Sequence, residues 1–532
     1  MRQRAGRALA ALAWAAGPLV LSRWPAAVAR VPALGVLRGP LGLALLALGT
    51  AVAVGRLWRP RARLDPSTGA LFAWAAAFYL VVGLWYTSRL RVSGDEPHYL
   101  LMAQSLWREH DLDLRDNLSR EDYLEYTPGP LAPHFGAPRR DGRPFPAHGP
   151  GLSLLLAPVY AAGGRLACAA LLGLAAAALT IEARALAVSS TGKKHAALIA
   201  WAAAAGPPVA FYAFHIYTEV PSALALALGL RLLLGTSTPL RAGAAGLAVL
   251  ALPWLHVKMI PAAGALGLVA LARLRGRPLA AFLGVMVAGA AAYGLYFAPP
   301  FGRPSPLSLY HGLPQYALAS PVRGAFGLLL DRSFGLLPYA PVFLLAGAGL
   351  VTLAQGRLRE TWPHLLVAAA VLAPLPTWRM WWGGQCPPAR FLVPLVPFLA
   401  VALAVRQAEG RRGLVRWTAP LLAAGFGLFV FMTVRPAELM LLNRGDRPTR
   451  VWAALSGQTP LERYLPSLVG GGPDELRVAA LWAIALATLL VLDRLAQRSE
   501  VVDRLFRGLG LPVLLVFGTF VLVDVWARSG GG

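Results

Sequence analysis

Two adjacent carboxylates, Asp95 and Glu96, lie in the part of the sequence best suited to acid–base chemistry. They follow an apolar stretch and precede His98 and Tyr99. A carboxylate whose pKa is tuned by its surroundings can act as a general base. Acidic residues followed by proline also favour the first turn of a helix, so a purely structural role is the alternative.

Three further charged residues stand at the edges of apolar stretches: Glu219, Lys258 and Arg390. A charged side chain is costly in such a position, so each is a candidate for a functional residue. Glu219 could instead stabilise a helix start, and Lys258 could reach lipid headgroups. Arg390 is harder to explain structurally, because it opens an expected span at the outer face, against the positive-inside trend. Its guanidinium is suited to bind phosphate through two parallel hydrogen bonds. Carboxylates together with phosphate-binding cations predict a reaction on a phosphorylated lipid.

Arg379 and Arg390 bracket a segment that contains Trp382. Tryptophan at a membrane interface often belongs to the aromatic belt, which is the alternative explanation for Trp382. His148 lies in a short His-Gly-Pro-Gly stretch later in the same polar region as Asp95. We expect His98, Tyr99, His148, Glu219, Lys258, Arg379, Trp382 and Arg390 to contribute to substrate binding.

Composition sets the environment in which these residues act. Of 532 residues, 57% are hydrophobic and 14% are charged, whereas soluble domains are about 25% charged. This excludes an ordinary soluble enzyme and predicts an all-α polytopic membrane protein. The net charge of +25 is explained by arginine clusters that fix membrane orientation, so no nucleic-acid partner is expected. Cys168 and Cys386 are far apart and predict neither a disulfide nor a metal site.

Apolar stretches of membrane-spanning length predict a bundle of about 13 to 15 transmembrane helices. With the N-terminus inside, seven basic loops fall on the cytoplasmic side. The first apolar stretch is either an anchor or a cleaved signal peptide that ends near Ala27–Ala29. The expected spans are 8–24, 31–54, 68–88, 164–186, 195–212, 217–235, 240–257, 259–273, 278–297, 336–355, 362–378, 390–405, 416–434, 477–494 and 508–527.

This pattern divides the chain into five parts. N-terminal transmembrane helices (1–88) precede a long first extracytoplasmic loop (89–163), which ends in a short apolar juxtamembrane helix before the next span. A central bundle (164–434), an extracytoplasmic loop (435–476) and C-terminal helices (477–532) follow. The bundle carries outer loops at 298–335 and 379–389, and we expect 89–163 and 298–335, with Tyr310, His311, Tyr316 and Asp331, to form an acceptor pocket.

The order of these motifs resembles the GT-C superfamily of integral-membrane glycosyltransferases, which includes protein O-mannosyltransferases and aminoarabinose transferases. Each motif is short, and their order and shared side of the membrane carry the resemblance over nearly the whole chain. The chain has no Walker A, HExxH or GxSxG motif in a suitable context. The motifs are Gly-Asp-Glu-Pro-His-Tyr at 94–99, Phe-Pro-Ala-His-Gly-Pro-Gly-Leu at 145–152, Tyr-Thr-Glu at 217–219, Trp-Trp-Gly-Gly at 381–384 and Arg-Phe-Leu-Val-Pro at 390–394.

The resemblance implies transfer of a sugar from a polyprenyl-phosphate carrier to a lipid, glycan or protein acceptor, with inversion. The catalytic acid of the family would be Asp95, with Glu96 as the alternative, and Arg390 and Lys258 would hold the phosphate. Glu219, His98 and His148 would position the acceptor or a divalent metal, and the resemblance leaves metal dependence open. It also implies a multi-pass protein of the bacterial inner membrane whose active site faces the periplasm.

A lipid or glycan transporter without catalytic activity is the alternative function. Transporters are expected to carry ionisable residues and broken helices near the middle of the bilayer. The acids singled out above are expected at the outer edge instead, and this favours a transferase.

Overall fold

The computed structural model describes residues 12–13, 16–57, 66–302, 318–356, 358–440, 450–508 and 510–529. These residues are overwhelmingly helical and include no β-strand, only two isolated antiparallel bridges, Phe135 with Pro146 and Leu318 with Trp378. The expected all-α class is confirmed.

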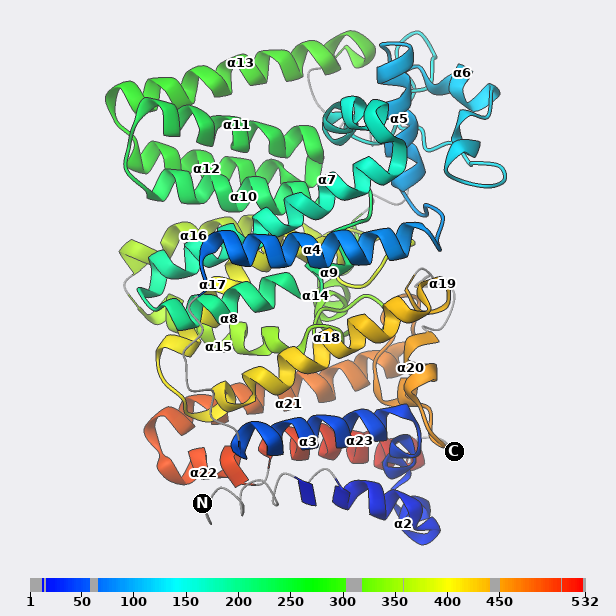
Figure 1. The fold of residues 1–532 in the computed structure, drawn as a ribbon, viewed down its shortest axis with the longest axis vertical. Helices are drawn as coiled ribbons and strands as arrows, with labels where there is room; N and C mark the ends of the chain where they lie inside the picture. Colours follow the sequence, from blue (N-terminus) through cyan, green and yellow to red (C-terminus); the bar gives the residue numbers. More distant parts are fainter. Residues whose placement is uncertain are drawn as a thin grey trace.

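The helices lie side by side in a broad array, with most axes nearly parallel (Figure 1). Their bounds are α2 Pro25–Arg30, α3 Pro40–Leu57, α4 Thr68–Thr87, α5 Glu96–Arg108, α6 Leu114–Ser119, α7 Gly151–Thr191, α8 Lys194–Ala205, α9 Val209–Tyr212, α10 Glu219–Leu234, α11 Pro239–Leu255, α12 Ile260–Arg273, α13 Gly276–Phe301, α14 Pro321–Leu330, α15 Leu344–Gln355, α16 Leu358–Leu372, α17 Val396–Ala408, α18 Thr418–Val434, α19 Pro436–Leu439, α20 Arg450–Leu455, α21 Pro473–Arg498, α22 Glu500–Gly508 and α23 Leu511–Ser529.

Within the described residues, 7 helices are long and apolar enough to cross a membrane. Several other expected spans form shorter helices. The expected span 195–212 breaks between α8 and α9 at Gly206-Pro207-Pro208, because proline cannot continue a helix. The expected span 31–54 is divided at Pro40 between a short 3₁₀ helix and α3. The expected span 8–24 lies partly outside the described residues.

In the view of Figure 1, helix α7 lies at the centre of the upper half of the molecule. It packs against α4, α5, α8, α10 and α17. Its backbone leaves helical geometry at Gly163 and Gly164, which separates a first part from a long second part that begins at Arg165. The two helices expected in this region therefore both form, joined at a glycine kink.

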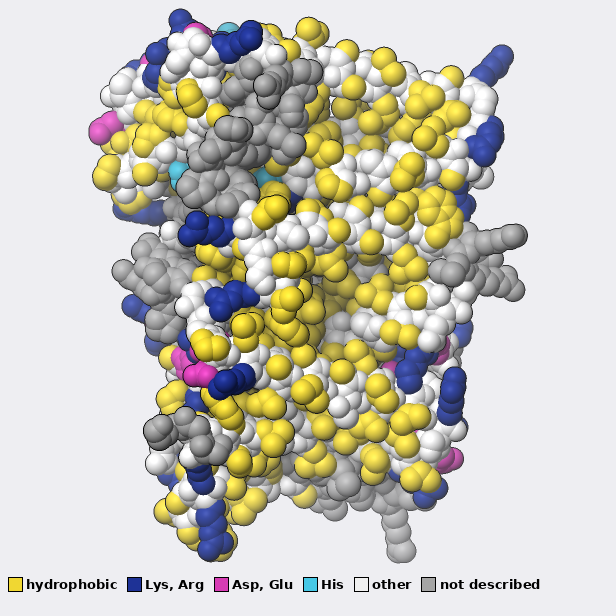
Figure 2. All heavy atoms as spheres, turned by 180° about the vertical axis from the view of Figure 1, so that it is seen from behind, with side chains coloured by type: hydrophobic (Ala, Val, Ile, Leu, Met, Phe, Trp, Pro, Cys, Tyr) yellow, Lys and Arg dark blue, Asp and Glu magenta, His cyan; other side chains and the backbone are white. Residues whose placement is uncertain are grey.

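The two ends of the parallel helices form opposite edges of the molecule. Helices α5, α6, α19 and α20 share one edge, whereas α22 lies at the other (Figure 1). Figure 2 shows Lys and Arg side chains gathered along both edges, with a mostly hydrophobic surface between them. The described parts of the segments expected as extracytoplasmic loops at 89–163 and 435–476 thus share one edge.

Candidate active site

Four charged residues from distant parts of the chain meet at the edge that carries α5. Asp95 immediately precedes α5, and Glu219 is the first residue of α10. Lys258 lies in a 3₁₀ turn, Val257–Met259, between α11 and α12. Arg390 is the first residue of the 3₁₀ helix Arg390–Leu395, which leads into α17. Each side chain therefore projects from the start of a helical segment.

Arg390 is the centre of this cluster. Its Nη2 donates to Asp95 Oδ2 at 2.6 Å, and its Nε donates to Glu219 Oε1 at 3.0 Å. Its Nη1 donates to the carbonyl oxygen of Gly383 at 2.8 Å, and the guanidinium lies 4.1 Å from the ring centre of Tyr217. The planar fork of an arginine can satisfy three acceptors in this way, whereas a lysine cannot.

Lys258 is fully buried and donates from Nζ to Glu219 Oε1 at 2.6 Å. Its ammonium also lies 3.9 Å from the ring centre of Phe391. Two carboxylates and two cations balance within the cluster, so Glu219 is neutralised from both sides. The geometry favours a role for Lys258 in holding Glu219 over the predicted direct contact with a lipid phosphate.

Asp95 is the accessible member of the cluster. Its side chain is 23% exposed, compared with 4% for Arg390 and 0% for Glu219 and Lys258. It makes no capping hydrogen bond to α5, although it stands at the cap position. The explanation of Asp95 as a helix start alone therefore does not account for its ion pair with Arg390.

Three histidines surround the exposed side of Asp95. The ring of His98 stacks on that of His134 with centres 4.0 Å apart, and His148 lies 5.7 Å from both. One ligand atom each of Asp95, His134 and His148 lies within 4.8 Å of the others. Nε2 of His148 is buried and has no hydrogen-bond partner among the described residues. This donor set fits a divalent cation.

His134 lies outside every motif and could not be singled out from the sequence. A local antiparallel pairing positions it, because Ala147 N donates to His134 O and Gly136 N donates to Phe145 O. This pairing puts His134 opposite the residue before His148.

The ionisation of this group follows from burial and charge. Burial raises the pKa of Asp95, but Arg390 and the neighbouring histidines outweigh it and hold the pKa below its usual value. Burial lowers the pKa of His148 to about 4, although Asp95 opposes that shift. Burial and His134 lower the pKa of His98 to about 2. An ionised Asp95 beside neutral His98 and His148 is the resulting state near neutral pH.

Glu96 is oriented away from the cluster and is 1% exposed. Its Oε2 accepts from Ser93 N at 2.9 Å, and its Oε1 accepts from Ile216 N at 2.9 Å. Both oxygens are thus used to join the segment before Asp95 to the segment before Glu219. The geometry favours Asp95 over Glu96 as the reacting carboxylate.

At Gly94 the chain lies very close to the segments that contain Tyr217 and Gln385, and this brings the motifs together. It has a φ of +58°, and a Cβ there would lie 2.4 Å from the hydroxyl of Tyr217 and 2.5 Å from the carbonyl oxygen of Gln385. The Tyr217 hydroxyl donates to the carbonyls of Ser93 and Gln385, each at 3.3 Å. Gly94 therefore lets three separate segments meet around one tyrosine.

The remaining predicted residues differ in their placement. Tyr99 is buried, with its ring centre 4.7 Å from that of His148. Trp382 is half-buried and packs edge-on against Trp381. Arg379 is exposed and has no hydrogen bond or ion pair to another described residue. Tyr99 therefore contacts the site, whereas the described residues show no polar contact of Arg379 with it.

Of the four side chains expected in the acceptor pocket at 89–163 and 298–335, the structure describes only Asp331. Asp331 is buried, and its carboxylate accepts from the backbone N–H groups of Ser333, Phe334 and Leu468. It therefore stabilises the turn after α14 and does not line a pocket. Tyr310, His311 and Tyr316 lie outside the described residues.

No family model matches the chain, and no curated protein matches it in sequence. Solved structures with a similar layout include ArnT from Cupriavidus metallidurans bound to undecaprenyl phosphate. It is 14% identical, with 88% of this chain and 79% of that chain covered and a TM-score of 0.45. Arabinosyltransferase EmbB from Mycobacterium smegmatis is 17% identical, with 91% and 44% covered and a TM-score of 0.42. The oligosaccharyltransferase AglB from Archaeoglobus fulgidus is 14% identical, with 80% and 55% covered and a TM-score of 0.35.

Proposed function

We propose that the protein is a membrane glycosyltransferase that moves a sugar from a polyprenyl-phosphate carrier to a cell-envelope acceptor. The observation that carries the proposal is the ion-pair cluster of Arg390 with Asp95 and Glu219. It combines one accessible carboxylate with buried cations at one end of the apolar helices. A lipid whose phosphate lies at the membrane surface would meet the cluster at this level.

The reaction has a simple balance. The acceptor hydroxyl oxygen forms a bond to the anomeric carbon while its proton passes to Asp95. The bond from the anomeric carbon to the phosphate oxygen breaks, and its electron pair leaves with the lipid phosphate. Attack opposite to the leaving group inverts the anomeric configuration. A carboxylate base and a positive environment for the leaving phosphate are the two requirements.

Arg390 is suited to both requirements. It keeps Asp95 ionised, and its guanidinium would stabilise the phosphate as it gains charge. Glu219 and Lys258 fix the orientation of Arg390, because Glu219 Oε1 accepts from both cations. Asp95 and Arg390 are therefore the proposed catalytic pair, and Glu219 and Lys258 are positioning residues.

The two cations of the cluster are balanced by its two carboxylates, so a further cation would add to the effect of Arg390 on the phosphate. Asp95, His134 and His148 would hold a divalent metal ion, and the unpartnered Nε2 of His148 supports this set. Such an ion would stabilise the charge that the phosphate gains as it leaves, so its loss would lower the rate of transfer more than the affinity for the donor. Removal of divalent metal with a chelator is expected to abolish transfer, and re-addition is expected to restore it.

The test is transfer of radiolabelled sugar from polyprenyl-phosphate donors by purified protein supplied with cell-envelope acceptors. Wild-type protein is expected to transfer label, and Asp95→Asn is expected to lower the rate by about 10²–10⁴-fold because the base is lost. Asp116→Asn is the matched control, since Asp116 lies in the same loop with an exposed side chain.

Absence of turnover by wild-type protein on every donor would contradict the proposal and favour a transporter. Transfer by Asp95→Asn at the rate of the Asp116→Asn control would contradict the assignment of the base. An unchanged rate after chelation would remove the metal from the proposal without affecting Asp95.

A further inference from the structure

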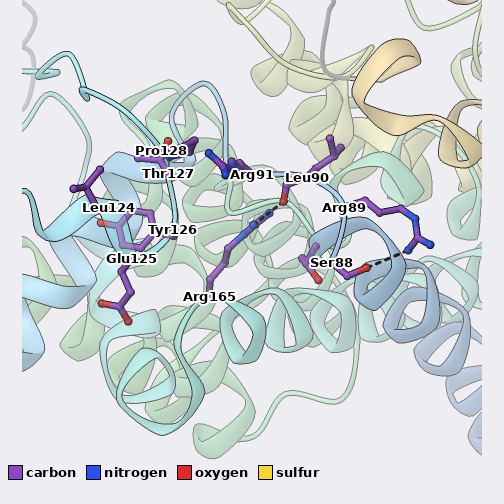
Figure 3. A pocket seen from close by; sticks show the side chains of 11 residues that line it. Ser88, Arg89, Leu90, Arg91, Leu124, Glu125, Tyr126, Thr127, Pro128 and Arg165 are labelled. Carbon is purple, nitrogen blue, oxygen red and sulfur yellow. Dashed lines mark hydrogen bonds between the residues drawn. The ribbon is translucent and has the colours of Figure 1, made fainter.

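A second polar site lies where α4 ends, apart from the Asp95 cluster. It is a cavity of about 390 Å³ between residues 87–91, residues 124–128 and Arg165 (Figure 3). None of the residues that line it belongs to the Asp95 cluster. It is open on one side, so a ligand can enter from the surrounding medium.

The cavity carries an excess of positive charge. Arg89, Arg91 and Arg165 line it, and Glu125 is its one acidic residue. The Glu125 carboxylate is already engaged outside the cavity, because it accepts from Arg108 Nη2 at 3.2 Å and from Gln104 Nε2 at 3.0 Å. The arginines are therefore not neutralised from within the site.

Two of these arginines have hydrogen-bond donors available for a ligand. Arg165 donates from Nη1 to the carbonyl oxygen of Leu90 at 2.8 Å, and this bond fixes the guanidinium across the cavity floor. Arg91 is exposed and makes no hydrogen bond or ion pair to any other described residue. Figure 3 shows its side chain directed toward Thr127 and Pro128. Arg89 differs, because it stacks on Trp85 and donates to the Ser88 hydroxyl.

The position of the cavity limits the source of its ligand. Its residues follow directly on the apolar helix α4 and meet the start of the second, apolar part of α7. Helix α4 ends, and the second part of α7 begins, at the same edge of the molecule, where the headgroups of a bilayer would lie. Arginine is also a favoured partner of phosphate, because its fork matches two phosphate oxygens.

We propose that this cavity binds the phosphate of an anionic membrane phospholipid as a site separate from that of the sugar donor. Arg91 and Arg165 bind the phosphate oxygens, and the hydroxyl of Thr127 supplies a further hydrogen bond. The acyl chains lie along the exposed apolar side chains of α4, among them Val81 and Leu84. The bound lipid ties the segment that leads to Asp95 to the membrane surface.

The experiment measures retention of dioleoyl phosphatidylglycerol by the full chain, using native mass spectrometry from a neutral detergent. Wild-type protein is expected to retain this lipid in preference to dioleoyl phosphatidylcholine. Arg91→Gln is expected to weaken retention about fivefold, which corresponds to the contribution of one arginine to binding at an anionic membrane surface. Because Arg91 is exposed and unpaired, this variant tests the site without disturbing the fold. The double variant with Arg165→Gln is expected to lose the preference.

The matched control is Arg435→Gln, which removes an arginine at the end of another apolar helix, α18, where the side chain is 71% exposed. Retention equal to wild type is expected for this control. Equal loss in the control and in Arg91→Gln would overturn the site. Displacement of the lipid by inorganic phosphate at equal concentration would assign the cavity to a soluble anion and overturn the lipid assignment. Sugar transfer is not part of the readout, so failure here is distinguishable from failure of the proposed function.

Discussion

Arg390 joins three acceptors that lie far apart in the sequence. It contacts Asp95, Glu219 and the carbonyl oxygen of Gly383, and it lies against the face of Tyr217. Its residue type and its place at an apolar boundary could be read from the sequence. Its partners could not, because nothing local relates residue 390 to residue 95.

Arg390→Lys tests whether this geometry matters for the reaction. A lysine keeps the charge but cannot reach three acceptors together, so we expect sugar transfer to fall by about 10²-fold with the protein still folded. Arg416→Lys is the control, since Arg416 also binds a buried aspartate, Asp503, at a distance from the site. Normal transfer by Arg390→Lys would show that Arg390 acts only through its positive charge and not through its geometry.

The buried pair of Glu219 and Lys258 predicts a pattern of stabilities. Removing one partner leaves an uncompensated buried charge, so Glu219→Gln or Lys258→Met alone should each cost about 3–5 kcal/mol in the free energy of unfolding. The double variant should be more stable than the sum of the two losses implies. Thermal unfolding in detergent measures this cycle, and strictly additive losses would contradict the pairing.

At the scale of elements, four helix starts converge on one edge, and close contacts between loops bring them there. The existence of these helices could be predicted from the apolar stretches and from the prolines and acidic residues at their starts. The local pairing of His134 with Ala147 could not, because a single backbone bridge leaves no periodic pattern in the sequence. Loop contacts of this kind decide which motifs meet.

Gly94→Ala tests the closest of these contacts. A methyl group would overlap the Tyr217 hydroxyl and the Gln385 carbonyl, and it would also strain a backbone with positive φ, at a cost of about 1–3 kcal/mol. We expect transfer to fall sharply. Gly129→Ala separates the two effects, because Gly129 has a φ of +81° but open space around it. Equal losses in both variants would assign the effect to backbone strain alone.

At the scale of the molecule, the all-α membrane architecture was predictable from composition alone, but the number of full-length spans was not. Proline at 207 and 208 and at 40 breaks two apolar stretches that look continuous by hydropathy. Buried pairs such as Arg406 with Asp493 also stabilise the opposite edge. These pairs escaped prediction because both partners lie in segments expected simply as basic cytoplasmic loops or spans.

The two edges of the molecule predict opposite accessibility in a cell. Ser119 is exposed on α6, and Ser237 is exposed between α10 and α11. Each can be replaced by cysteine as a labelling site. Both native cysteines are buried, so background labelling should be low. A membrane-impermeant maleimide is expected to label Ser119→Cys in intact cells and Ser237→Cys only after permeabilisation. Labelling of both in intact cells would contradict the predicted topology.

The central claim is that Asp95 acts on the acceptor during sugar transfer and not in holding the donor. The most direct measurement compares the single-turnover transfer rate with the dissociation constant of the polyprenyl-phosphate sugar for wild-type protein and Asp95→Asn. We predict that the rate falls by at least about 10²-fold while the dissociation constant changes by less than about threefold. A rate close to that of wild type, or a loss explained entirely by weaker donor binding, would contradict the claim.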